Sequence, residues 1–80
     1  MKIQLQDGRM LEGTALQIVQ AMRGLAFGAS QFSIPQYIQW VINNTEKFEG
    51  FHLDVQGKDD DELASGLVNE MLRAGLARTA

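Results

Sequence analysis

The chain begins with a strict alternation of polar and apolar residues, which predicts a β-strand over residues 2–6. Asp7-Gly8 follows and is typical of a turn, because glycine adopts positive φ at little cost. Residues 9–12 then supply a return strand of an antiparallel hairpin. The chain therefore opens with two strands before any helical pattern appears.

The register of this hairpin follows from which side chains share a face. A two-residue loop would place Ile3 opposite Glu12, so that apolar and polar side chains mix on each face. A three-residue loop over residues 6–8 places Ile3 opposite Leu11 and Lys2 opposite Glu12. We predict this second register, because both pairs are chemically matched.

Three stretches repeat apolar residues at three- and four-residue spacing, which predicts amphipathic helices. The first follows Thr14 as N-cap, and the second lies between Ser33 and Gly50. The third begins in the acidic run 59–62 and ends at Gly75. The stripe of the second helix consists of Ile34, Tyr37, Ile38, Val41, Ile42, Thr45 and Phe48.

Residues 51–56 alternate again and predict a third strand, with residues 57–58 as a turn. The predicted order is ββααβα, an α+β fold with a three-stranded, mostly antiparallel sheet packed on three helices. The hairpin alone would be marginal, so we expect the third strand to pair with it. Residues 1–80 form one domain, with residues 77–80 as a frayed tail.

Composition narrows the functional classes. The chain is 45% hydrophobic, has no cysteine and carries a formal net charge of −3. Phosphate contacts favour basic surfaces, so the acidic balance disfavours nucleic acid as the main partner. No stretch is apolar for long enough to act as a signal peptide or to cross a membrane. We expect a soluble, cytoplasmic protein.

Few residues suggest chemistry. The acidic run 59–62 lacks the alternating ligand spacing of a calcium loop and is better interpreted as a cap that complements the helix dipole. His52 and Asp54 share one face of the expected strand, but no nucleophile accompanies them. The glycines match no phosphate-binding motif. We therefore predict no catalytic residue, no cofactor, no metal and no small-molecule ligand.

The aromatic and amide residues of the second helix are the candidate partner-binding surface. Most aromatic side chains, Phe27, Phe32, Phe48 and Phe51 among them, are expected in the core. Trp40 lies beside the stripe, next to neutral amides, a composition typical of protein interfaces. The candidate site consists of Tyr37, Trp40, Gln36, Gln39 and Asn43.

Three functions are compared on this basis. The favoured one is a small non-catalytic interaction module that binds a protein partner or a second copy of itself. The alternative is a nucleic-acid-binding domain of winged-helix-like type, in which Gln36, Gln39, Asn43 and Asn44 read base edges. A ligand pocket inside the core is disfavoured, because it would hollow out most of so small a domain.

The opening segment also resembles a known group of proteins. Residues 7–14, Asp-Gly-Arg-Met-Leu-Glu-Gly-Thr, followed by Ile-Val-Gln-Ala-Met at residues 18–22, resemble a family of short uncharacterised bacterial proteins. Members of that family are similar in having a hairpin, a helix and a later tyrosine-bearing helix. The resemblance implies a natural bacterial domain, and no activity comes with it.

Overall fold

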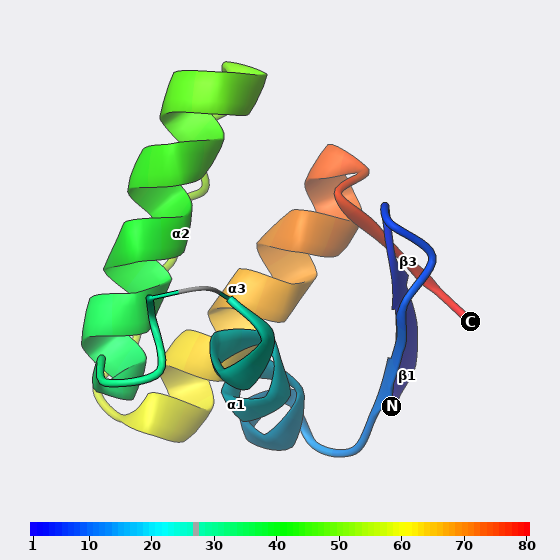
Figure 1. Cartoon of the computed structure of the whole chain (residues 1–80), viewed down its shortest axis with the longest axis horizontal. Helices are drawn as coiled ribbons and strands as arrows, with labels where there is room; N and C mark the ends of the chain where they lie inside the picture. The colour runs from blue at the N-terminus through cyan, green and yellow to red at the C-terminus, as the bar shows by residue number, and fades with distance from the viewer. Residues whose placement is uncertain (27) are drawn as a thin grey trace.

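The computed structural model describes residues 1–26 and 28–80. Its elements are β1 (Lys2–Leu5), β2 (Met10–Glu12), α1 (Ala15–Leu25), α2 (Ile34–Glu49), α3 (Asp60–Ala74) and β3 (Ala77–Thr79). The strands form one sheet in the order β2-β1-β3. Figure 1 shows three layers, with the sheet at one side, α1 and α3 in the middle, and α2 at the other side. The α+β class, the three helices and the three-stranded antiparallel sheet are confirmed.

The hairpin has the predicted register. Ile3 pairs with Leu11 and Lys2 with Glu12. The Leu5 N–H donates to Arg9 O at 2.8 Å, which leaves a three-residue loop between them. Gly8 closes that loop at φ 93°, a conformation that side-chain-bearing residues rarely adopt. Side-chain matching across the strands therefore sets the register, and Gly8 allows it.

The third strand lies elsewhere than predicted. Residues 77–79, expected to fray, form β3 and pair antiparallel with β1, with Gln4 opposite Arg78 and Leu5 opposite Ala77. Gly75 ends α3 in the left-handed conformation and turns the chain back along β1. The observed order is ββαααβ, because β3 follows the last helix.

Residues 51–56, predicted as that strand, form no ladder and run as an extended strap along α3. The Asp54 N–H donates to Glu70 Oε1 at 2.8 Å, so a helix side chain replaces a neighbouring strand. Gly66 lets the strap approach α3, since a Cβ there would lie 3.2 Å from Val55 Cγ1. The alternation correctly indicated that Leu53 is buried, since this residue is 1% exposed. It did not indicate whether the backbone pairs with another strand.

The helices begin where the sequence predicts. Thr14 and Ser33 each cap a helix, and each belongs to a capping box completed by a glutamine three residues later. Asp59 caps α3 by accepting a hydrogen bond from the Glu62 N–H at 2.8 Å, and the acidic residues after it lie in the first turn. The acidic run therefore stabilises a helix start, as predicted.

The core lies between the sheet and α3 and continues to α2. Its largest fully buried side chains are Ile3, Ile18, Leu53, Leu67, Val19 and Val68. Phe32 packs against it, half-buried. Phe27, also expected in the core, lies outside the described residues.

The strap provides a direct test of this packing. Leu53→Ala is expected to lower the free energy of unfolding by about 2–5 kcal/mol, because it opens a cavity in a closed core. That loss is large beside the roughly 4–12 kcal/mol typical of a chain this long. Phe51→Ala in the same segment should cost about 1 kcal/mol or less. Urea denaturation measures both, and equal losses would contradict the observed orientation of the strap.

Candidate functional site

The candidate surface is carried by α2, whose start is fixed by local hydrogen bonds. The Gln36 N–H donates to Ser33 Oγ at 3.3 Å, and Gln36 Oε1 accepts from the Ser33 N–H at 2.9 Å. Gln36 was predicted to bind a partner, and its side-chain oxygen is engaged in this capping box. Its role in the structure is to start the helix.

Tyr37 and Trp40 occupy different environments. Tyr37 is 3% exposed and belongs to the core, so the prediction that it contacts a partner does not fit its position. Trp40 is 37% exposed and stacks on Tyr37, with ring centroids 5.8 Å apart and planes inclined by 24°. Phe32 lies against the same indole at 6.5 Å. Trp40 is therefore held in place by two rings while part of it faces solvent.

The amide residues of α2 are bonded along the helix. Gln39 Nε2 donates to Asn43 Oδ1 at 3.0 Å, and both residues are exposed. Asn44 Nδ2 donates to Trp40 O at 2.8 Å. The side chains next to Trp40 on this helix are therefore neutral amides that form hydrogen bonds along the helix.

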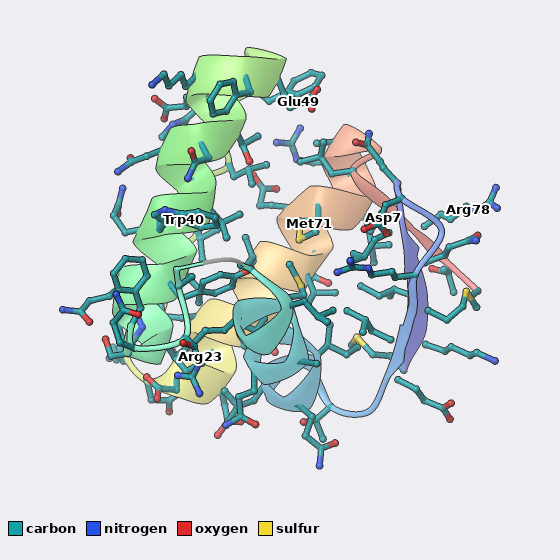
Figure 2. The ribbon with its side chains drawn as sticks, in the orientation of Figure 1. Asp7, Arg23, Trp40, Glu49, Met71 and Arg78 are labelled. Atoms are coloured by element: carbon teal, nitrogen blue, oxygen red, sulfur yellow. The ribbon has the colours of Figure 1, made fainter. Side chains whose placement is uncertain are left out.

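Two phenylalanines that the sequence assigned to the core are exposed. Phe48 is 72% exposed and Phe51 is 46% exposed. Phe48 continues the core-facing stripe of α2, but in Figure 1 the last turn of that helix extends past α3. Figure 2 shows Glu49 at this free end. The signal available in the sequence was the position of Phe48 at the very end of its helix, next to Gly50.

Trp40 and Phe48 lie along one side of α2. Trp40, Asn44 and Phe48 follow one another at four-residue spacing, and residues so spaced share a helix side. Two full steps of four residues correspond to a rise of about 12 Å. We call Trp40, Asn44 and Phe48 the α2 flank.

Charged groups join the strap to the helices on either side of it. His52 Nδ1 contacts Glu46 Oε1 of α2, not Asp54. Arg73 donates two hydrogen bonds to Glu70, at 2.7 and 3.0 Å. These bonds, together with the one from the Asp54 N–H, lower the pKa of Glu70 from 4.5 to about 2. Glu70 is therefore ionised at neutral pH and fixes the backbone of the strap.

Metal-binding clusters and membrane-spanning helices are both absent from the described residues. Within residues 1–26 and 28–80, no group of three or more His, Asp or Glu residues is arranged to hold a metal ion. No helix in the same part of the chain is both long and apolar enough to cross a membrane.

Comparison of the chain with models of protein families, with curated proteins and with solved structures found no match. The resemblance of residues 7–22 to a bacterial family therefore stays a prediction.

The environment of Tyr37 predicts its titration. Burial raises the pKa of Tyr37 from 10.0 to about 12, because the phenolate loses solvation. Folding thus favours the protonated phenol, so its contribution to stability is complete below pH 10 and is lost as the pH rises towards 12. Tyr37 is the single tyrosine, so tyrosinate absorbance reports it directly. A midpoint near 10 in the folded protein would show that the ring is solvated.

Glu70 predicts the opposite dependence. Because its folded pKa lies below its ordinary value, its contribution to stability is complete above pH 4.5 and is lost as the pH falls towards 2. Glu70→Gln should reduce the fall in melting temperature over this range. Glu49→Gln, at the exposed end of α2, is the control. Parallel melting curves for the two variants would contradict the assigned role of Glu70.

Proposed function

We propose that the protein is a small, cytoplasmic, non-catalytic interaction module that binds a protein partner, or a second copy of itself, through the α2 flank and Phe51. The observation that carries this proposal is the 72% exposure of Phe48 at the end of a core-facing stripe. An apolar side chain in that position gains free energy when another surface covers it.

The area that a stable interface needs indicates how much of α2 contacts the partner. A phenylalanine buries roughly 150–250 Å², whereas a standard interface removes about 800 Å² from each partner. Phe48 and Phe51 are therefore too small a surface by themselves. Extending the contact along the α2 flank adds the exposed part of Trp40, a residue type that often dominates binding energy.

Charges around the flank favour a protein partner. Glu46, Lys47 and Glu49 are close neighbours of Phe48 in the sequence, and the Lys47 Nζ lies 5.4 Å from the centre of the Phe48 ring. This mixture of signs offers complementary contacts to another protein surface. A nucleic acid or an anionic membrane would favour a basic face, so the nucleic-acid alternative receives no support from these charges.

Self-association is tested first, by light scattering over a range of protein concentrations. The single tryptophan, Trp40, should change its emission as copies associate. Phe48→Ser together with Phe51→Ser should weaken association by about tenfold or more, since each loses apolar burial. Met10→Thr is the matched control, because Met10 is also an exposed apolar residue but lies on β2.

If the protein stays monomeric, a photo-crosslinking residue at position 44 tests for a different partner in host cells. A specific adduct should disappear in the double serine variant and persist with Met10→Thr. A monomer without an adduct that depends on Phe48 would refute the proposal.

A further inference from the structure

A crevice opens at the hairpin end of the sheet, where β1 and β3 separate. The last paired residues are Leu5 and Ala77. The next N–H on the β3 side, that of Leu76, donates to Met71 O at 2.9 Å, so the ladder ends there. The crevice has a volume of about 300 Å³. Its lining consists of Gln4, Leu5, Gln6, Gly8, Gly75, Leu76, Ala77 and Arg78.

Arg78 lines this crevice as an exposed side chain, and a glutamine holds its guanidinium. Its Nε donates to Gln4 Oε1 at 2.8 Å, and Gln4 Nε2 in turn lies 3.4 Å from Gly8 O. Figure 2 shows Arg78 on the side of the sheet that faces away from the helices. Because only Nε is used in this bond, the two terminal nitrogens of the planar guanidinium remain available as paired donors.

The charge of Arg78 is not balanced by the crevice. The lining contains no carboxylate, and the hydrogen-bonding side chains beside Arg78 are the neutral amides of Gln4 and Gln6. The ion pairs among residues 1–26 and 28–80 join Arg9 to Asp7, His52 to Glu46 and Arg73 to Glu70. Arg78 takes part in none of them, although the chain as a whole is acidic.

We propose that this crevice binds a carboxylate, held by the terminal nitrogens of Arg78 and by the second N–H of the Gln6 side-chain amide, whose Nε2 already donates to Gly75 O at 3.5 Å. A guanidinium edge matches the two oxygens of a carboxylate. One arginine among neutral donors balances a single negative charge, so a monoanion fits better than a phosphate dianion. The crevice lies at the surface, so a ligand there leaves the core intact. Its residues are separate from the α2 flank, and the inference does not depend on the proposed function.

The test is a titration with sodium acetate, followed by amide NMR spectra at constant ionic strength set with sodium chloride. The amide signals of Gly8 and Gly75 and the side-chain amides of Gln4 and Gln6 should shift and saturate. Arg78→Gln should weaken acetate binding by about tenfold or more, because a charged hydrogen bond is lost. Arg78→Lys keeps the charge but loses the paired donors of the guanidinium, so its affinity for acetate should lie between those of the native chain and Arg78→Gln.

Lys2→Gln is the matched control, since it removes the same charge from the outer face of β1, away from the crevice. It should bind acetate as the native chain does. Shifts that fail to saturate, that persist in Arg78→Gln, or that vanish equally in Lys2→Gln would overturn the proposal. Tighter binding of inorganic phosphate than of acetate would do so as well.

Two further probes separate the sources of the carboxylate. A short glycine peptide with a free carboxyl end and the same peptide amidated at that end are titrated in the same way. Tighter binding of the free peptide than of acetate supports the chain end of a protein as the ligand. Equal binding of the two carboxylates supports a small organic acid. Binding of the amidated peptide equal to that of the free peptide would overturn the proposal.

Discussion

The structure depends on the burial of α3, the element that contacts α1, α2 and β3. Ala64, Leu67 and Val68 are fully buried on this helix. Both ends of this helix are defined by single residues: Asp59 caps its start, and Gly75 ends it and turns the chain into β3. Because the core closes around α3, elements that extend beyond this helix are left partly uncovered. The end of α2, where Phe48 is exposed, is the clearest example.

Side-chain contacts between helix and strap replace a sheet that the sequence suggested. Glu70 accepts from the strap backbone at Asp54, and Glu62 accepts from the Lys58 N–H at 2.9 Å. The bond to Asp54 satisfies a backbone group that a neighbouring strand would otherwise serve, and the bond to Lys58 satisfies the backbone of the turn that follows the strap. The absence of a side chain at Gly66 also eases the close approach of strap and helix, since a Cβ there would press on Val55.

The sequence predicted those parts of the fold that depend on local chemistry. The hairpin register follows from Ile3, Leu11 and the positive φ of Gly8, and the helix starts follow from Thr14 and Ser33. Alternation over residues 51–56 correctly indicated burial at Leu53 but not at Phe51, and it could not identify what the backbone of this segment bonds to. The strand at Ala77–Thr79 is too short to have a pattern, and it forms because Gly75 brings it beside β1.

For the candidate sites too, the sequence predicted what depends on local pattern and missed what depends on how distant segments pack. Trp40 was identifiable from its place at the edge of a stripe, whereas the exposure of Phe48 depends on where α3 ends relative to α2. Gln36 was predicted as a partner contact, and the sequence did not show that a capping box uses its side-chain oxygen. Arg78 could not be identified at all, because the crevice it lines joins residues more than seventy positions apart in the chain.

Native-state amide hydrogen exchange tests the central role of α3 most directly. The amides of Leu67 and Val68 should exchange only through global unfolding, with a free energy equal to that from urea denaturation. The amides in the last turn of α2, from Lys47 to Glu49, should exchange at a much lower free energy. Exchange of Leu67 and Val68 through an opening easier than that of Lys47 to Glu49 would contradict the account.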